Sequence, residues 1–413
     1  MKATQRSLIK RLPTALAALA TLTFVPQAYS ADTISEAFSG GKTNANLRYR
    51  YETVNDKKTA TASTVRLRLG YETADFKGLG AKVEFEHLTS LGGQSYNSKA
   101  NGQTAFSVIA DPEFTEVNQA YLSYSGIPDT NAKYGRQVIV LDNQRFIGNV
   151  GWRQNEQTYD ALSVVNKSLS DTKITLAYIS NVNRIFSNNA LATSGAAAGN
   201  FAMQSSIVNV NYKGLSAGEI VGYSYMLDFS LPANAGNSSK TYGLRFKGKT
   251  AMGGNTLHYT AEAATQSNYT NNPNTYTVSY SLLEGGIDFK PVNVKLGYEV
   301  LGSNGSKAFS TPLATLHAFN GWVDMFLGTP ATGLTDSYVG ASTKLAGVKL
   351  AAVYHNFSAA SGSTKYGTEL DVVLVKVISK KYLVGAKYGS FATQSAPTRA
   401  DTNKLWLTAQ AKF

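Results

Sequence analysis

Arginine recurs at every second position in two segments near the start of the chain. Residues 46–52 read Asn-Leu-Arg-Tyr-Arg-Tyr-Glu, and residues 65–72 read Val-Arg-Leu-Arg-Leu-Gly-Tyr-Glu. Alternate side chains of an extended strand share a face, so the arginines face one way and the leucines and tyrosines face the other. A guanidinium stays charged and binds carboxylate or phosphate through two parallel hydrogen bonds, and a row of them can hand an anion along a surface. The four arginines are Arg48, Arg50, Arg66 and Arg68.

Carboxylates lie on the same polar faces as these arginines. Glu52 and Glu72 end the two segments, and Glu84 and Glu86 alternate with apolar residues in the next one. The mixture predicts a transverse field in which a basic sector faces a row of carboxylates. The alternative interpretation is that all of these groups are solvated and pair with one another, and the sequence leaves both open.

The stretch from residue 133 to residue 155 combines arginines with glycines and a tryptophan. Its pattern predicts a strand that ends near Leu141, followed by a polar loop that contains Arg145, Trp152 and Arg153. Two arrangements are compatible with this loop. It either folds inward and narrows an opening, with its two arginines at the constriction, or packs over a rim where its charges are only solvated.

Residue types that are common in enzymes occur without the neighbours that catalysis needs. Gly-Leu-Ser-Ala-Gly at 214–218 matches a hydrolase nucleophile motif, but it falls in a predicted turn between strands rather than between a strand and a helix. The four histidines are dispersed and form no metal-binding pair, and the chain has no cysteine. The sequence has no glycine-rich nucleotide loop. We therefore expect no catalytic site, no cofactor and no bound metal.

The elements that carry these residues are predicted to be strands. From residue 44 to residue 413 bulky and polar side chains alternate, and the connections switch between tight turns and longer polar stretches. Nineteen segments qualify, but residues 316–327 lack a clean period of two, so we assign them to a long loop with a short helix. The predicted fold is all-β: a transmembrane antiparallel β-barrel of about 18 strands, with short periplasmic turns and long extracellular loops.

The first thirty residues predict an exported protein. A basic start is followed by an apolar run over residues 12–25 and by Ala28-Tyr29-Ser30, the pattern of a signal peptide that is cleaved after Ser30. Residues 31–42 then form a periplasmic N-terminal segment, and residues 43–413 form the barrel. No other stretch approaches the roughly 18 apolar residues of a membrane-spanning helix. In hydrocarbon only helices and closed barrels satisfy their backbone hydrogen bonds.

The charge balance favours acidic partners. The chain has 39 Lys+Arg and 27 Asp+Glu, and loss of the four basic residues of the signal peptide leaves 35 basic residues and a net charge of +8. An exported basic protein is expected to meet acidic solutes or polysaccharide rather than nucleic acid. The expected partners are outer-membrane lipid and lipopolysaccharide, small hydrophilic or anionic solutes, and the barrel-assembly machinery, which reads a terminal strand such as the one that ends at Phe413.

Two patches of the sequence resemble one family. The first consists of Gly135-Arg136-Gln137, Asp142, Arg145–Gly148, Trp152-Arg153 and Thr158-Tyr159-Asp160, and the second of residues 318–327 with Thr329-Pro330 and Gly333-Leu334. Both look like the alginate-export-type outer-membrane porins, which are eighteen-stranded barrels of Gram-negative bacteria. The resemblance implies a monomer, with a trimer left open, and a positively charged conduit. It associates Arg136, Arg145 and Arg153 with the pore and Asp160 with holding this region together.

Three functions fit these patterns. The preferred one is a water-filled channel for passive diffusion of small hydrophilic solutes that favours anions. The second is a dedicated exporter of an acidic polysaccharide such as alginate, and the third is an outer-membrane enzyme or adhesin that uses the barrel as an anchor. Conductance in planar bilayers separates them, because an open channel carries ohmic current, a closed exporter needs polymer or loop deletion to conduct, and an anchor carries no current.

Overall fold

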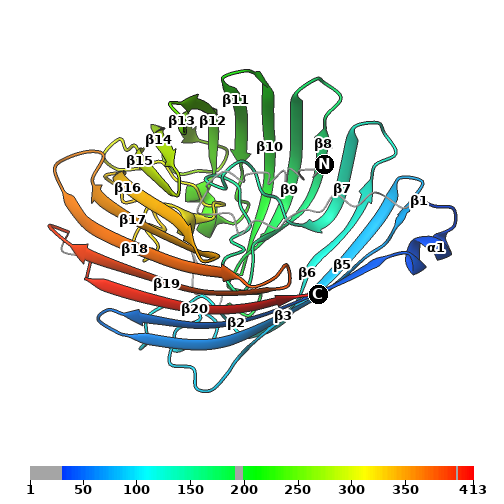
Figure 1. Cartoon of the computed structure of the whole chain (residues 1–413), viewed down its shortest axis with the longest axis horizontal. Coiled ribbons are helices and arrows are strands. Elements are labelled where there is room, and N and C mark those ends of the chain that lie inside the picture. Colours follow the sequence, from blue (N-terminus) through cyan, green and yellow to red (C-terminus); the bar gives the residue numbers. More distant parts are fainter. Residues whose placement is uncertain (1–29, 191–198, 397–398) are drawn as a thin grey trace, which may run out of the picture.

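The structure, a computed structural model, describes residues 30–190, 199–396 and 399–413. Within these residues one antiparallel sheet closes on itself into a barrel (Figure 1). Strand β2 (Lys42–Asn55) pairs with β3 (Ala60–Glu72) on one side and with the last strand, β20 (Thr402–Lys412), on the other. The long strands therefore leave no open edge, as a barrel in hydrocarbon requires. The predicted signal peptide lies outside the described residues, apart from Ser30.

The wall consists of eighteen long strands in the described part of the chain, which confirms the predicted number and fold class. Each long strand pairs antiparallel with the next one along the chain, and the pairing of β2 with β20 completes the ring. The other strands of the wall are β5 (Leu79–Ser90), β6 (Phe114–Tyr124), β7 (Thr130–Gln137), β8 (Thr158–Asn166), β9 (Thr172–Asn183), β10 (Asn200–Leu215), β11 (Gly218–Leu227), β12 (Ser239–Met252), β13 (Asn255–Asn268), β14 (Thr277–Phe289), β15 (Val292–Leu301), β16 (Leu334–Leu345), β17 (Val348–Ser358), β18 (Lys365–Val377) and β19 (Tyr382–Thr393).

The two rims of the barrel differ in the length of their connections. One rim, which also holds the start of β2 and the end of β20, has turns as short as residues 216–217 and 253–254. The opposite rim, called the loop rim below, carries the long connections, among them residues 91–113, 138–157 and 302–333. This confirms the predicted alternation, including the loop assigned to residues 316–327. Short 3-10 helices occur in two of the loops: η2 (Pro232–Asn237) and η3 (Leu316–Ala318).

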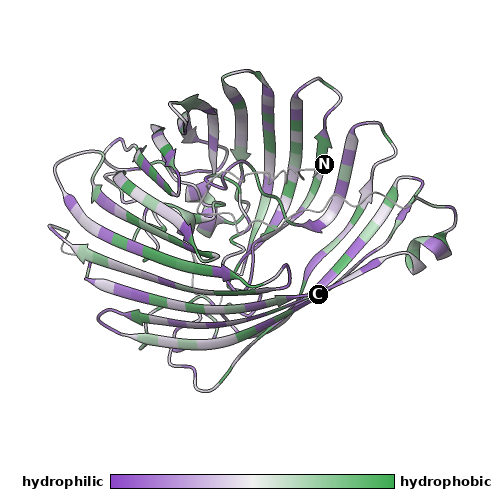
Figure 2. Cartoon of the chain, viewed as in Figure 1, coloured by the Kyte–Doolittle hydropathy of each residue, from purple (hydrophilic) through white to green (hydrophobic). Residues whose placement is uncertain are grey.

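Hydrophobic and hydrophilic residues alternate along many of the strands (Figure 2), and the exposure of their side chains places most apolar ones on the outside and most charged ones on the inside. On the outer face Leu47, Leu69 and Leu283 have 45%, 50% and 64% of their surface exposed, whereas inward-facing Arg48 and Glu52 have 4% and 0%. A soluble protein would bury the leucines. Their exposure fits a wall that is surrounded by hydrocarbon.

Aromatic side chains mark the rim of tight turns on the outer face. They lie at strand ends, which is where outer-membrane barrels carry an aromatic girdle at the boundary between the polar and apolar parts of the bilayer. No helix among the described residues is long and apolar enough to span a membrane. The residues of this aromatic girdle are Tyr71, Tyr124, Tyr212, Phe289, Tyr382 and Phe413.

The segment before β2 forms a small appendage at this rim. It contains the two-residue strand β1 (Ser30–Ala31) and the helix α1 (Ile34–Ser39). Strand β1 pairs in parallel with β4 (Asp75–Phe76), which lies in the turn between β3 and β5. The domain limits expected from the sequence, with a segment at 31–42 before the barrel, stay a prediction.

Strand β7 ends earlier than expected. The alternating apolar pattern predicts a strand that ends near Leu141, but β7 stops at Gln137. Beyond it Ile139 and Leu141 are 6% and 5% exposed, and both pack in a buried apolar cluster with Phe146. The chain leaves the wall there because these side chains are buried inside the barrel rather than turned to lipid.

Candidate functional site

Two long loops fold into the barrel and meet there. We define residues 138–157 as the first inner loop and residues 302–333 as the second inner loop. The amide of Gly148 donates to the carbonyl of Leu313 at 2.9 Å, and the amide of Thr315 donates to the carbonyl of Gln144 at 3.0 Å. Hydrogen bonds from side chains add to these backbone bonds, so the two loops are firmly joined to each other. The first loop therefore folds inward, whereas a constriction formed by Arg145 and Arg153 stays a prediction.

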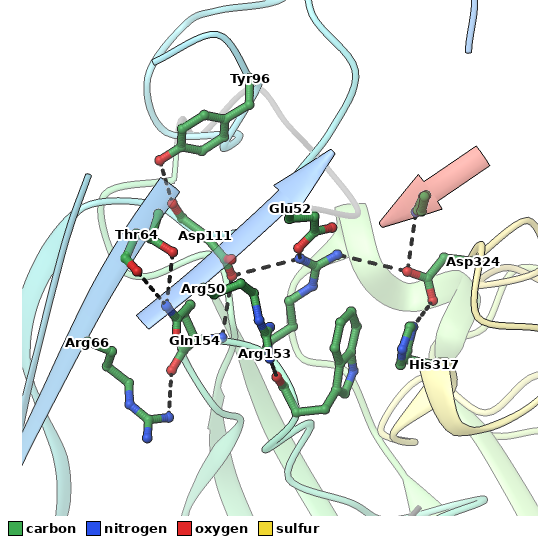
Figure 3. Close-up of polar contacts among 12 residues, drawn as sticks. Arg50, Glu52, Thr64, Arg66, Tyr96, Asp111, Arg153, Gln154, His317 and Asp324 are labelled. Atoms are coloured by element: carbon green, nitrogen blue, oxygen red, sulfur yellow. Dashed lines mark hydrogen bonds and ion pairs between the residues drawn. The ribbon is translucent and has the colours of Figure 1, made fainter. Parts of the chain in front are cut away.

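The arginines of β2 and β3 bind the backbone of the first inner loop. Arg48 donates from Nε to the side chain of Gln154 at 2.9 Å and from Nη2 to the carbonyl of Arg153. Arg66 donates from Nη1 to the carbonyl of Gln154 at 3.1 Å (Figure 3). The Gln154 side chain also donates to the hydroxyl of Thr64 at 2.9 Å. Hydrogen bonds to Arg48 of β2 and to Arg66 and Thr64 of β3 thus hold Gln154 against the wall.

Backbone carbonyls explain how like charges coexist at this position. Arg48 and Arg66 are direct cross-strand partners, an arrangement that is destabilising on an ordinary sheet. Both are also nearly inaccessible, with 4% and 2% of their surface exposed. Carbonyl oxygens of the loop face the guanidiniums, and hydrogen bonds to charged groups are stronger than neutral ones. The arginines therefore fasten the loop, and any effect that they have on ion selectivity stays a prediction.

Arg50 and Arg68 continue the same attachment. Arg50 donates to the carbonyl of Trp152 at 2.5 Å, and its guanidinium carbon lies 5.5 Å from the centre of that indole ring. Arg68 forms an ion pair with Glu86 and a second one with Glu156 of the loop, at 2.8 Å. All four predicted arginines consequently contact the first inner loop directly.

The carboxylates expected to face the arginines across the lumen lie beside them instead. Glu86 is the cross-strand partner of Arg68 on the neighbouring strand. Glu52 follows Arg50 along the same strand and binds Arg153 of the loop at 2.7 Å. Strands β2, β3 and β5 are neighbours in the sheet, so their polar faces form one continuous sector of the wall. Glu52 and Glu86 therefore form local ion pairs within that sector, and the expected transverse field across the lumen stays a prediction.

The other predicted residues lie on the wall outside this attachment. Arg136 and Asp160 pair at 2.8 Å between β7 and β8, and their side chains are 25% and 30% exposed. They lie on the same parity as the exposed residues Tyr134 and Leu162, so this pair is on the outer face of the wall and does not line the lumen, in contrast to the expectation for Arg136. Glu84 accepts a hydrogen bond from Asn118 at 2.6 Å. Glu72 is exposed at the end of β3 on the rim of tight turns. None of these four, therefore, belongs to the contact between the inner loops and the wall.

Arg153 connects the first inner loop to three carboxylates (Figure 3). Besides Glu52, its guanidinium lies 3.8 Å from Asp111 and 3.9 Å from Asp324 of the second inner loop. Burial alone would lower the pKa of Arg153, but the neighbouring carboxylates, Glu52 first, raise it above its ordinary value. The group therefore stays charged and holds the two loops and strand β2 together.

All three tryptophans of the chain surround one ammonium group. The Nζ of Lys387, on β19, lies 5.2 Å from the ring centre of Trp152, 4.6 Å from that of Trp322 and 5.0 Å from that of Trp406. These rings come from the first inner loop, the second inner loop and the wall strand β20, respectively. Cation–π attraction in a desolvated place is worth about 2 kcal/mol or more. The cluster joins both loops to the wall at the middle of β19 and β20, where Lys387 and Trp406 are cross-strand partners.

His317 packs into the same cluster as a neutral ring. It stacks on Trp152 with ring centres 3.4 Å apart and an interplanar angle of 15°. Its Nδ1 donates to Asp324 at 2.7 Å, and its Nε2 accepts from Lys387. Burial lowers the pKa of His317 to about 3, even though the charge of Asp324 acts in the opposite direction. A second proton would have to sit on Nε2, where the positive ring and the ammonium of Lys387 would repel each other.

Acidification is expected to loosen this junction. In an opened junction the ring titrates near its ordinary value of 6.5, whereas in the closed one its pKa is about 3. The open form therefore takes up the proton first as the pH falls, so the junction is most stable above about pH 6.5 and weakens down to about pH 3. We expect larger current fluctuations through the reconstituted protein at pH 4 than at pH 7. His317→Phe keeps an aromatic ring on Trp152 but cannot titrate, and a pH response unchanged in this variant would contradict the assignment.

Arg145 anchors the other end of the first inner loop. Its side chain is 1% exposed, and its Nε lies 2.8 Å from Glu299 of β15, which is 4% exposed. Its Nη2 donates to Asn320 of the second inner loop at 3.1 Å, and its guanidinium lies 4.8 Å from the ring centre of Phe319. Burial would lower the pKa of Arg145, but the charge of Glu299 raises it.

A cavity of about 1030 Å³ lies between the inner loops and other loops of the same rim, and we refer to it as the vestibule. Basic side chains dominate its described lining, eight against two acidic ones. Aromatic rings lie next to several of the cations: Arg184 is 4.0 Å from the ring centre of Phe201, and Arg399 is 4.2 Å from that of Phe326. The basic residues are Lys57, Lys58, Lys99, Arg145, Arg153, Arg184, Arg399 and Lys404, and the acidic ones are Asp56 and Asp324.

Sequence reasoning found two of the eight basic vestibule residues and missed the rest. Arg145 and Arg153 were identified from the loop between β7 and β8. The others come from loops and strand ends far apart in the chain, which carry no shared motif. The sequence contains one indication of the tryptophan cluster. Trp406 lies between Leu405 and Leu407 on β20, and since these two leucines face outward, Trp406 faces the lumen.

The closed antiparallel barrel, with its apolar outer face and charged interior, defines a transmembrane β-barrel of the outer-membrane type. Among solved structures, OpdK of Pseudomonas aeruginosa, crystallised with vanillate, superposes with a TM-score of 0.73 at 12% identity, over 91% of this chain and 99% of that chain. OccAB2 of Acinetobacter baumannii gives 0.73 at 13% identity, over 92% and 99%. OccK9 (OpdG) of Pseudomonas aeruginosa gives 0.72 at 10% identity, over 91% and 99%.

At 10–13% identity, the similarity to these structures is one of fold. They support the eighteen-stranded Gram-negative barrel that the sequence resemblance implied, but not the alginate-export type specifically. No protein-family model matches the chain, and a search of curated proteins finds no match.

Proposed function

We propose that this chain is an outer-membrane channel for the passive diffusion of small hydrophilic solutes and that it favours anions. The vestibule is the observation that carries the proposal, because its described lining has eight basic and two acidic side chains. The apolar outer wall and the aromatic girdle support a place in the outer membrane. Lipid and lipopolysaccharide then cover the outer face, the barrel-assembly machinery inserts the chain, and the channel acts as a monomer.

The excess of positive charge can select anions without a dedicated binding pocket. A cavity with one sign of charge and low-dielectric walls raises the local concentration of counter-ions. Arg145, Arg153 and Lys404 form ion pairs with carboxylates, so the attraction of a solute rests chiefly on Lys57, Lys58 and Lys99. At physiological ionic strength this attraction reaches about 8 Å. Anions would gather at the loop rim before they pass the inner loops.

The vestibule also has the size and the surface for small organic anions. Its volume of about 1030 Å³ is close to the upper end of small-molecule sites, which hold roughly 300–1,000 Å³. Phe201 and Phe326 offer apolar surface next to guanidiniums. Vanillate, the carboxylate in the OpdK crystal, is therefore a suitable test solute.

Recordings in planar bilayers test the proposal. The purified protein should carry ohmic current, and a salt gradient should give a reversal potential on the anion side. Vanillate added on the side of the loop rim should reduce chloride current in a concentration-dependent way. Absence of current under all conditions, or cation preference, would overturn the channel or its selectivity, respectively.

Neutralising the vestibule lysines is expected to reduce anion preference without a large change in conductance. Lys57 and Lys58 lie in an exposed turn, and Lys99 lies in another loop, so a triple change to glutamine removes charge without opening a buried contact. The reversal potential should move by several millivolts toward the cation side. The matched control is Lys290→Gln, Lys380→Gln and Lys381→Gln, three exposed lysines of the opposite rim, which should shift it less. Equal shifts in the two triple variants would assign selectivity to net charge rather than to the vestibule.

A further inference from the structure

The helix α1 presents two large apolar side chains on one side. Ile34 and Phe38 are four residues apart, which places them on one helical face, and they are 62% and 60% exposed. Ala37 is buried against the barrel. Thr33 and Glu36 form a capping box, with a hydrogen bond of 3.1 Å from the Glu36 amide to the threonine hydroxyl. The capping box thus stabilises a six-residue helix whose two large apolar side chains are mostly exposed.

The helix is attached to the outside of the barrel. Tyr71 faces outward, since it is the cross-strand partner of the outward residue Val83, and its hydroxyl donates to the carbonyl of Phe38. Its ring covers the backbone of Gly41 so closely that a Cβ there would lie 2.1 Å from the tyrosine oxygen. The amide of Ala74 donates to the carbonyl of Ala37 at 2.9 Å. Figure 1 shows α1 at the outer edge of the barrel, away from the lumen.

The position of the helix is continuous with the lipid-facing wall. Tyr71 belongs to the aromatic girdle at the rim of tight turns, and its hydroxyl is hydrogen-bonded to the backbone carbonyl of Phe38. Side chains at this depth sit at the boundary between headgroups and acyl chains. A short amphipathic helix at that boundary lies in the plane of the interface with its apolar face buried in the lipid. The exposed Lys77 lies in the adjacent turn, where an ammonium can meet a lipid phosphate.

We propose that residues 31–41 form an interfacial foot that inserts Ile34 and Phe38 into the leaflet on the side of the tight turns, where they bind the acyl chains of phospholipid. The proposal rests on the outer-membrane location given above. The foot fixes the depth of one sector of the barrel, that of β3 and β5, from outside the lumen. The pairing of β2 with β20 closes the wall without it, so the foot is separable from the channel.

The absence of cysteine from the chain allows a direct test. Phe38→Cys, labelled with a fluorescent probe in proteoliposomes of phosphatidylethanolamine and phosphatidylglycerol, should be quenched by lipids that carry a spin label near the headgroup. Iodide in the buffer should quench it weakly. The same label at Ser35→Cys, on another side of the helix, should respond several-fold less to the lipid quencher and more to iodide.

Two further labels keep the outcomes distinct. Leu69→Cys lies on the outer wall and should be quenched by lipid, and Ser361→Cys lies in an exposed loop of the other rim and should be quenched by iodide. If Leu69→Cys responds to lipid and Phe38→Cys behaves like Ser361→Cys, the foot is refuted and the membrane barrel stands. If Leu69→Cys also fails to respond, the membrane location itself is refuted. Unchanged conductance of the Phe38→Cys protein confirms that the barrel is intact.

The attachment can be tested separately. Tyr71→Phe removes the hydroxyl that binds the Phe38 carbonyl and keeps the ring over Gly41. A spin label at position 38 should become more mobile in this variant, while ohmic conductance stays the same. An unchanged mobility would mean that Tyr71 does not hold the foot.

Discussion

Replacing Arg48 and Arg66 together by methionine is expected to raise single-channel conductance several-fold and to make the current noisier. Both guanidiniums bind the backbone of the first inner loop at Gln154, and Arg48 also binds the side chain of that residue. Each hydrogen bond to a charged group contributes roughly 1.5–3 kcal/mol. Without these bonds the C-terminal half of the loop is attached to β2 and β3 only through Arg50, Arg68, Arg153 and the bond between Gln154 and Thr64. The weakened segment can then shift within the lumen. Recordings of single channels in planar bilayers measure the effect.

A matched pair of variants separates attachment from charge. Arg48→Lys with Arg66→Lys keeps both positive charges but removes the planar set of donors that reaches several acceptors at once. If these arginines act by fastening the loop, the lysine variant should show part of the conductance increase. If they act on the solute by charge, the lysine variant should resemble the parent, and the methionine variant should lose anion preference at unchanged conductance. The latter result would restore the selectivity role that the sequence suggested for these residues together with Arg50 and Arg68.

Arg145→Met is expected to lower the free energy of unfolding by about 3–5 kcal/mol, because it leaves the carboxylate of Glu299 buried without its counter-charge. Both side chains are almost inaccessible, at 1% and 4% exposure. Denaturant unfolding of the protein in lipid vesicles measures the change. Adding Glu299→Gln to the variant should recover part of the loss, since the amide can still accept the hydrogen bond of the Tyr280 hydroxyl.

The pair of Arg136 and Asp160 is the natural control for that experiment. It has the same 2.8 Å separation, but its side chains are 25% and 30% exposed on the outer face, close to the loop-rim ends of β7 and β8, where a polar environment screens the two charges. Exposed ion pairs contribute about 0–1 kcal/mol. Arg136→Met should therefore change the free energy of unfolding by less than about 1 kcal/mol. A similar loss in both variants would show that burial does not control the strength of these pairs.

The barrel was largely predictable because its physics is local. Period-two alternation in residues 46–52 and 65–72 depends only on which side of a strand meets hydrocarbon, and the structure confirms the outward and inward faces in both. The end of β7 was mistaken because Ile139 and Leu141 continue the alternating pattern after the chain has turned inward. A periodic pattern does not distinguish an apolar side chain that meets lipid from one that meets a packed loop.

The site was predictable only in part, because its contacts are long-range. The inward face of Arg48 followed from sequence, but its partners are backbone carbonyls about a hundred residues away, and carbonyls carry no sequence signal. The ion pair of Arg145 with Glu299 spans 154 positions. The grouping of Trp152, Trp322 and Trp406 around Lys387 depends on both inner loops having folded. Such contacts can be inferred only when it is known which parts of the chain the closed wall brings together.

The seam between β2 and β20 has a consequence for how the protein is made. Its two halves stand at opposite ends of the barrel sequence, and the entropy lost on joining them grows with the logarithm of the intervening length. Until Thr402 and the residues after it have been added, the incomplete sheet has two edge strands with unpaired backbone groups, which can pair with any other extended chain. Truncation by a single strand would make that hazard permanent, because β2 would then have no partner at the seam.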